Sequence, residues 1–343
     1  MGETMKVIIY GDPQIKNHPE FSSVDKRGLS NWIMVGKNCF RQMVDYAEEH
    51  KITWFIGLGD MCETKNYVDN SILCSIEEIL REIQNINIHH EWVIGNHDFS
   101  NPHFPIQRIF YNYFNNIHDT LSSCTQEPNF SYLPWMQDQN LYVEQLKEAK
   151  GDYLFTHNTI VPIDLGSLEL PGLFNIKDMN LKKFKLIFSG HIHKPQQVGN
   201  VIYVGSMFQT DFGEEGEQKR FVVLDIETGT FESIDFKYPR LINIIGMEIN
   251  KDIKDCYVKF KIEVPDKGFL INRNELKEQA MKVGALGVKI EIIKTKQEKK
   301  VRLSSEQIKT KTLKDFVGDY CVEKKENGEI IWSYVEKLLK GNN

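Results

Sequence analysis

The residues best suited to chemistry are aspartates, histidines and one asparagine that each follow a short apolar run. They are Asp12, Asp60, Asn96 with His97, His157, and His191 with His193. Imidazole nitrogen and carboxylate oxygen bind first-row metal ions, so this set has the composition of a metal site. One such residue alone is more often a turn former or a satisfied core histidine. Five apolar runs that all end in ligand-type residues favour a metal centre.

The apolar runs predict the elements that must hold these side chains. Buried strands are predicted at residues 6–10, 52–58, 92–94, 152–156 and 185–188. Residues 29–49 and 72–83 carry apolar side chains at helical spacing. Strands that alternate with helices predict an α/β fold in which helices cover a largely buried sheet. Sheets of this kind place ligands at the carboxyl ends of their strands, which is where these residues lie.

The mixture of carboxylate, imidazole and amide ligands suits manganese, iron or zinc. A carboxylate can bridge two such ions. A two-metal site binds a phosphate, lowers the pKa of a bound water and stabilises the attacking and leaving oxygens. A histidine that is close to the metals but not bound to them can protonate the leaving oxygen. The residues therefore predict phosphoester hydrolysis.

The composition of the 343 residues is that of an ordinary globular protein, with 41% hydrophobic and 26% charged residues. We find no apolar run long enough to span a membrane and no signal-peptide pattern at the N-terminus. Six scattered cysteines without a Cys-x-x-Cys pair fit a reducing cytoplasm. From residue 240 onward 22 Lys and Arg face 16 Asp and Glu, against 20 and 32 before it. The basic window 289–314 permits polyanion binding, although a solvated charged surface explains it equally well.

The sequence changes character after Tyr238-Pro239, which marks a predicted boundary. A strand at 256–264, a helix at 274–283 and a strand at 288–293 predict a small β-α-β unit. Residues 298–312 are polar and basic, as in a linker. Two amphipathic segments, 313–320 and 330–339, close the chain and are predicted as helices.

The ligand-type residues stand in motifs that resemble one family. Gly11-Asp12, Gly59-Asp60, Gly95-Asn96-His97-Asp98, His157 and Gly190-His191-Ile192-His193 resemble the calcineurin-like metallophosphoesterases. The resemblance covers residues 6–236. Within that superfamily the chain is most similar to the SbcD-type nuclease subunit of DNA double-strand-break repair complexes and to its phage recombination-endonuclease relatives. The segments 131–136, 205–206 and 211–214 carry this narrower resemblance.

The resemblance implies a four-layer αββα sandwich with a small α+β capping domain and C-terminal helices. The implied domains are a nuclease domain at 1–239, a DNA-contacting capping domain at 240–296, and a linker with partner-binding helices at 297–343. It also implies two manganese ions, with magnesium, iron or zinc as other possibilities.

Roles for single residues follow from the resemblance. Asp60 would bridge the metals, Asp12 and His193 would bind the first ion, and Asn96, His157 and His191 would bind the second. His97 would be the general acid, and Glu63 and Asp98 would support the site without binding metal. The family's first motif is Asp-x-His, but here Gln14 stands in place of the histidine. Because a neutral amide oxygen is a weaker ligand than imidazole, the first ion is expected to bind loosely.

The implied activity is that of a manganese-dependent DNA nuclease, a 3′–5′ exonuclease on duplex ends and an endonuclease on single strands. It would act with an SMC-like coiled-coil ATPase in DNA recombination, repair or replication. A homodimer through residues 70–83 and 106–114, within a heterotetramer, is expected in a bacterial or phage-infected cytoplasm, without a membrane.

Two alternatives stay open. One is a small-molecule phosphodiesterase or nucleotidase, which would need neither the extra domain nor its basic character. The other is a weakly catalytic or non-catalytic DNA-end adaptor for the ATPase, because Gln14 weakens the site. A protein Ser/Thr phosphatase is less favoured, because its Gly-Asp-x-x-Asp-Arg-Gly motif is absent at residues 59–65.

Overall fold

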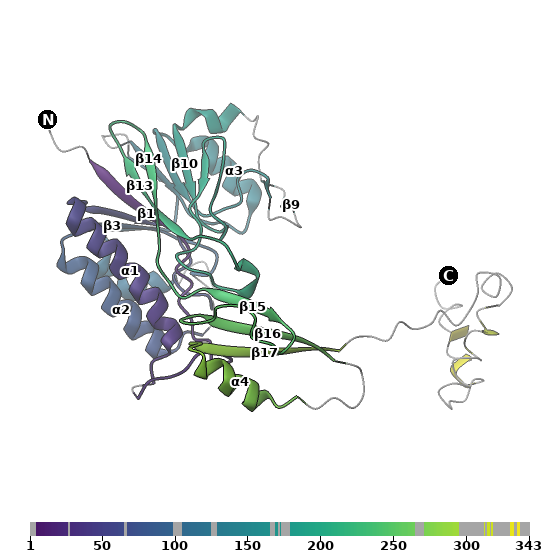
Figure 1. Ribbon diagram of the computed structural model, residues 1–343. Coiled ribbons are helices and arrows are strands. Elements are labelled where there is room, and N and C mark those ends of the chain that lie inside the picture. Colours follow the sequence, from purple (N-terminus) through teal and green to yellow (C-terminus); the bar gives the residue numbers. More distant parts are fainter. Residues whose placement is uncertain are drawn as a thin grey trace. The chain divides into compact units, whose positions relative to one another are not determined.

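Two mixed six-stranded sheets lie face to face in the computed structural model, each with helices on its outer face (Figure 1). The structure describes residues 5–294 except 27, 65–66, 99–104, 125–128, 165–168, 171, 173–178 and 265–270. It also describes nine positions further on: 312, 314, 315, 317, 330–332, 335 and 336. No helix among the described residues is long and apolar enough to cross a membrane.

The first sheet has the strand order β14-β13-β1-β2-β3-β4. Its strands are β1 (Lys6–Tyr10), β2 (Trp54–Gly57), β3 (His89–Val93), β4 (Asn116–His118), β13 (Arg220–Asp225) and β14 (Phe231–Asp235). The first four pair in parallel, and β13 returns antiparallel to β1. The parallel part matches the alternation of strands and helices that the N-terminal sequence predicts.

The second sheet has the order β11-β12-β10-β7-β6-β5. Its strands are β5 (Ser122–Ser123), β6 (Phe130–Leu133), β7 (Tyr153–Thr156), β10 (Leu186–Ser189), β11 (Gln196–Val198) and β12 (Val201–Tyr203). Strands β6, β7, β10 and β12 pair in parallel. A separate two-stranded sheet joins β8 (Ile163–Asp164) to β9 (Glu169–Leu170).

Three apolar cores separate four layers. Along β1, Val7 and Ile9 face the core between the sheets, while Ile8 and Tyr10 face the core under the first pair of helices, as the two-residue period of a strand requires. Those helices are α1 (Asn31–His50) and α2 (Asn70–Asn85). The third core lies under α3 (Gln139–Glu148) and the short helix η2 (Met179–Lys183). The predicted four-layer αββα sandwich is confirmed.

Side-chain caps start the three long helices of the sandwich. Ser30 accepts from the backbone N–H of Trp32 at the start of α1. Asp69 and Asp138 cap α2 and α3 in the same way. Each cap satisfies an N–H that has no partner within the helix, a contribution of about 1 kcal/mol. Two shorter 3-10 segments complete the described helices of this region: η1 (Ile106–Tyr113) and η3 (Phe212–Glu214).

A third sheet follows the predicted boundary at Tyr238-Pro239. It contains β15 (Leu241–Ile245), β16 (Tyr257–Val264) and β17 (Gly287–Lys294), with α4 (Arg273–Lys282) between the last two. The sequence predicted the last three elements but missed β15, which pairs in parallel with β16. The Tyr257 ring lies 4.9 Å from that of Trp32 in α1. Residues 1–262 and 271–292 form one compact unit, and residues 263–270 and 293–343 form another. Most of the predicted C-terminal helices, 313–320 and 330–339, lie outside the described residues.

Candidate metal centre

The predicted metal ligands and the predicted general acid, His97, all follow the carboxyl ends of parallel strands. They are Asp12 and Gln14 after β1, Asp60 after β2, Asn96 and His97 after β3, His157 after β7, and His191 and His193 after β10. Three of the strands belong to the first sheet and two to the second. The two sheets therefore contribute jointly to one site.

The backbone is left-handed at three of these residues. The angle φ is 47° at Asp12, 59° at Asp60 and 74° at His191. Residues other than glycine rarely adopt this conformation. Strained backbone of this kind costs about 1–3 kcal/mol per residue and clusters at functional sites, where surrounding contacts hold it. The strain here turns three side chains toward one volume.

Glycines allow the loops that carry the ligands to approach closely. A Cβ atom on Gly95 would lie 2.3 Å from Asp60 Oδ1 and 2.9 Å from His157 Cε1. A Cβ atom on Gly59, where φ is +93°, would lie 2.6 Å from His157 Nδ1. A side chain at either position would displace a candidate ligand, so the Gly-Asp and Gly-Asn pairs have a steric cause.

Asp12, Asp60 and His157 form the centre of the site. All three are buried, and one ligand atom from each lies within 4.8 Å of the others. His157 Nδ1 donates to the carbonyl of Leu58 at 2.6 Å, which leaves Nε2 facing Asp60 Oδ2 at 3.4 Å. Two carboxylates and an imidazole at this spacing fit a divalent metal ion.

Asn96 and His191 extend the site on the His157 side. Asn96 Oδ1 lies 2.9 Å from His157 Nε2 and 2.9 Å from His191 Nδ1. A carboxamide oxygen only accepts hydrogen bonds, so a proton or a metal ion must mediate its contact with each nitrogen. These three side chains fit a second group of ligands, next to Asp60.

His193 and Gln14 lie on the Asp12 side. His193 Nε2 is 4.0 Å from Asp12 Oδ1. Gln14 is buried, and its amide nitrogen donates to Asp60 Oδ2 at 3.0 Å. The structure therefore brings Gln14 to the site and gives it a contact with a candidate bridging carboxylate. Its role as a metal ligand stays a prediction.

His97 and Glu63 meet beside the carboxylates. The backbone N–H of His97 donates to Asp60 Oδ1 at 2.7 Å. His97 Nδ1 contacts the backbone carbonyl of Glu63, so this nitrogen carries a hydrogen and Nε2 is the nitrogen left for chemistry. The Glu63 carboxylate pairs with Lys16. Glu63 thus orients His97 through its main chain.

Asp98 joins the loops that follow β2 and β3. It is 1% exposed and accepts the backbone N–H groups of Gly95 (2.8 Å), Asp60 (3.0 Å) and Met61 (2.8 Å). The indole of Trp92 donates to it as well. It makes no contact that would suit a metal ligand; it holds the Asp60 and Asn96 loops at a fixed separation.

The two acids at the centre differ in their electrostatics. Burial would raise the pKa of Asp60, but His157 and His97 lower it below the usual value. Burial, together with the nearby charge of Asp60, raises the pKa of Asp12 to about 6, although His157 and His193 oppose this. Burial also opposes protonation of His157, yet Asp60 and Asp12 raise its pKa to about 9. Burial and the charge of His157 lower the pKa of His191 to about 4. A buried cation would relieve the repulsion between the carboxylates, which is the electrostatic condition for a metal site.

Sequence reasoning missed the residues behind His193. His193 Nδ1 lies 3.0 Å from Glu214 Oε1 and 3.1 Å from Thr210 Oγ1. Lys219 in turn contacts Glu214 Oε2 at 2.9 Å. Glu214 lies in segment 211–214, which carries part of the resemblance to SbcD-type nucleases, but the resemblance implies no role for a residue of this segment. A buried lysine cannot be recognised from the sequence.

Comparisons with known proteins agree with this geometry. Residues 5–195 match the family model for calcineurin-like phosphoesterases. A relative, exonuclease subunit 1 of Enterobacteria phage T4, is 23% identical in an alignment 222 residues long, which covers 57% of this chain and 59% of that protein. The match thus spans less than two thirds of the relative.

Solved structures show weaker similarity. A dimetal phosphatase from Danio rerio has a TM-score of 0.40 at 11% identity, covering 68% of this chain and 100% of that one. The Pseudomonas putida nuclease MPE has a TM-score of 0.32 at 11% identity, covering 66% and 87%. These scores are too low to bear on function. The family match spans more than half of the 343 residues and includes all of the candidate ligands. The chain therefore belongs to the calcineurin-like phosphoesterases, a family of metal-dependent enzymes.

Proposed function

We propose that the protein is a manganese-dependent DNA nuclease with two metal ions, acting as a 3′–5′ exonuclease on duplex ends and as an endonuclease on single strands. The observation that carries the proposal is the convergence of Asp12, Asp60 and His157. Asn96 with His191, and His193 with Gln14, flank this centre on its two sides. When bound, divalent ions would activate water and neutralise charge on a phosphate.

The protein's own groups would then bind, orient and protonate. Asp60 lies between the two ligand groups and is held by the His97 N–H and by Gln14. His97 has one nitrogen fixed by the Glu63 carbonyl. Its other nitrogen can give a proton to the leaving oxygen, a contribution typically of about 10²–10⁴-fold in rate. Asp98 keeps the two loops in place during the reaction.

DNA as substrate rests on two observations. The relative from phage T4 is named as an exonuclease subunit. In addition, the positive charge from residue 240 onward could contact phosphates without reading sequence. Several lysines of the third sheet are paired, such as Lys259 with Glu291 and Lys289 with Glu20. Residues 240–296 are proposed as a capping and DNA-contacting unit. DNA phosphates would have to compete with the glutamates for these lysines.

Partners are proposed on similar grounds. The T4 relative is named as a subunit, which supports a partner protein. We propose that this partner is an SMC-like ATPase that docks on residues 297–343. Ile109 and Tyr111, two large side chains of η1, are 66% and 64% exposed. With α2 they would form the expected homodimer surface. Ile109→Glu should then shift the molar mass in light scattering from dimer to monomer without loss of the fold.

The test is cleavage by the full chain with manganese. The substrates are a labelled linear duplex, a labelled single strand and a small phosphodiester, with Asp60→Ala as the matched control. The proposal predicts that DNA is cut and that Asp60→Ala abolishes cutting.

Other outcomes separate the alternatives. Cleavage of the small diester without cleavage of DNA would replace the proposal with a small-molecule phosphodiesterase. DNA binding without cleavage of any substrate would indicate an adaptor with a weak site. DNA cleavage that survives Asp60→Ala would place the chemistry elsewhere in the chain.

A further inference from the structure

A buried lysine and a glutamate stand directly behind His193. Lys219 is 0% exposed, which is rare for lysine unless its charge is matched. Its ammonium lies 2.9 Å from Glu214 Oε2, 2.7 Å from Glu217 Oε2 and 2.8 Å from the backbone carbonyl of His193. An ammonium has three hydrogens, so these three acceptors satisfy it completely.

Glu214 connects this lysine to the imidazole. Its Oε1 lies 3.0 Å from His193 Nδ1, and the hydroxyl of Thr210 also donates to Oε1 at 2.9 Å. The backbone N–H of Thr210 donates to Oε2 at 3.0 Å. A carboxylate has no hydrogen to give, so the hydrogen of the contact with His193 must sit on Nδ1. When the ring is neutral, the other nitrogen, Nε2, is the one with a free lone pair, and it lies 4.0 Å from Asp12 Oδ1.

Lys219 therefore holds His193 twice, through the backbone carbonyl and through Glu214. We infer that Glu214 and Lys219 are positioning residues that fix the Nδ1–H form of His193 and aim its Nε2 into the Asp12 side of the metal centre. The part of this inference that concerns metal binding rests on the proposed function. Carboxylates that hold metal-bound histidines in this way raise ligand basicity and fix ring orientation.

The Asp12 side has particular need of such support. Gln14 offers only a neutral amide to this side, and its amide nitrogen is engaged with Asp60. His193 is then the imidazole of that side, so the affinity of the ion held there depends on how well His193 is oriented. Loss of an orienting partner typically weakens metal binding by about 10–100-fold.

Manganese binding by the full chain tests the inference, measured by calorimetry and by electron paramagnetic resonance of bound and free ion. Glu214→Gln and Lys219→Met should each weaken one manganese site by about tenfold or more and leave the other unchanged. Glu214→Asp should recover part of the affinity. The matched control is Glu215→Gln, because Glu215 is the next residue but pairs with Lys251 and Asn243. Wild-type manganese affinities at both sites in Glu214→Gln would overturn the inference.

A second readout needs no metal. Long-range nitrogen–proton NMR spectra of the metal-free protein should show a protonated Nδ1 on His193, and Glu214→Gln should remove or redistribute that signal. An unprotonated Nδ1 in the wild type would overturn the inference even if Glu214→Gln failed to fold. If the wild type binds manganese and responds as described but cuts no DNA, the proposed function fails and the positioning role stands.

Discussion

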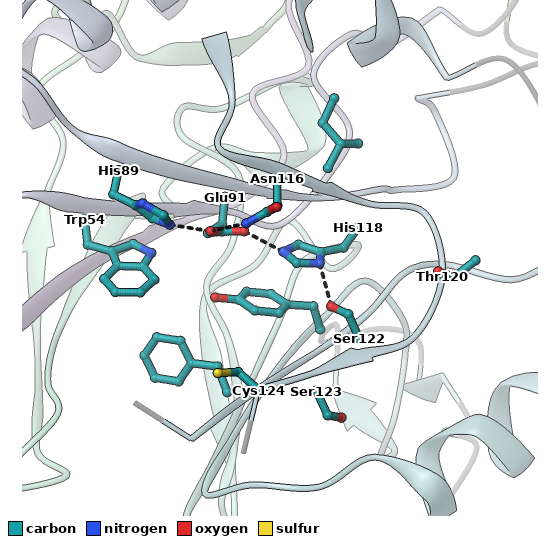
Figure 2. A pocket seen from close by; sticks show the side chains of 12 residues that line it. Trp54, His89, Glu91, Asn116, His118, Thr120, Ser122, Ser123 and Cys124 are labelled. Carbon is teal, nitrogen blue, oxygen red and sulfur yellow. Dashed lines mark hydrogen bonds and ion pairs between the residues drawn. The ribbon is translucent and has the colours of Figure 1, made fainter. Parts of the chain in front are cut away.

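Two clusters of histidine and carboxylate involve β3, and they behave differently. The metal centre follows its carboxyl end. Within β3, His89 and Glu91 meet His118 of β4 and line a pocket of about 570 Å³ between the edges of the two sheets (Figure 2). Both clusters combine imidazoles with a buried acid, so residue types alone do not distinguish them.

In the second cluster the polar atoms satisfy one another. Glu91 accepts from His118 Nε2 at 2.6 Å and from Asn116 Nδ2 at 2.9 Å, and it also contacts His89 Nε2. The hydroxyl of Ser122 lies 2.7 Å from His118 Nδ1. Figure 2 shows this chain of contacts running along one side of the pocket. The carboxylate faces imidazoles and an amide, and within the described part of the chain no second carboxylate faces it.

The pKa shifts of the acids express the difference. Burial would raise the pKa of Glu91, but its hydrogen bonds with His118 and Asn116 lower it below the usual value. At the metal centre, burial and Asp60 raise the pKa of Asp12 to about 6. The anion of Glu91 is therefore stabilised by the fold, whereas the anion of Asp12 is destabilised until a cation arrives. Asp12 and Glu91 are both buried acids, and they differ in how well the surrounding groups stabilise the charged form.

The largest effect should come from Asp12→Asn. We expect the rate of DNA cleavage to fall by about 1000-fold or more, roughly 4 kcal/mol of transition-state stabilisation, because a metal ligand is lost. The metal-free variant should unfold at a temperature at least as high as the wild type, because a destabilised buried anion has been removed. Cleavage rates and thermal unfolding with EDTA measure the two effects. A variant that loses both activity and metal-free stability would contradict this view of the site.

For Glu91→Gln we expect the opposite of Asp12→Asn: stability should fall, and cleavage activity should be retained. Removal of the charge leaves the hydrogen-bond network around His89 and His118 partly unsatisfied, which should reduce the free energy of unfolding by about 2–4 kcal/mol. Cleavage per folded molecule should stay within about twofold of wild type. Urea unfolding measures the loss, with the exposed Glu232→Gln as a control that should change stability by less than about 0.5 kcal/mol. Loss of cleavage in a folded Glu91→Gln protein would remove the distinction between the clusters.

Gln14→His should strengthen manganese binding on the Asp12 side of the metal centre. Imidazole binds these ions more strongly than a neutral amide, so the manganese concentration for half-maximal cleavage should fall by about tenfold. The measurement is a manganese titration of cleavage rate for both proteins, with Gln139→His at the exposed start of α3 as control. Identical titration curves for wild type and Gln14→His would show that the first ion does not bind loosely for want of this histidine.

The smallest expected effect is a change in the free energy of unfolding at acidic pH. Because the pKa of Glu91 is lowered in the folded state, its contribution to stability is present above the ordinary value of 4.5 and is lost as pH falls below it. The difference in unfolding free energy between wild type and Glu91→Gln should therefore shrink below about pH 4.5. Urea unfolding at pH 6, 4.5 and 3.5 measures the difference. A gap that widens with acid would mean that Glu91 is not the stabilised anion.

Much of the sandwich follows from local patterns. The apolar runs at residues 6–10 and 152–156 became β1 and β7 because a buried strand needs little more than a short apolar run and a turn. The periodic segment at 29–49 became α1 for a similar reason. The strand β15 was missed because it directly follows the break at Tyr238-Pro239 and pairs with a strand that comes later in the chain. A strand whose formation depends on a pairing partner elsewhere in the chain cannot be recognised from its own residues.

The sequence by itself determined which residue types stand at the strand ends, and the glycines beside them marked where loops approach. Only the tertiary structure decided which polar groups meet. Glu214 reaches His193, Asp98 joins two loops, and Glu91 is enclosed by histidines. The physical reason is that strand and helix periodicity arises from neighbours in the chain, whereas a hydrogen bond or an uncompensated charge depends on groups that packing brings together from far apart.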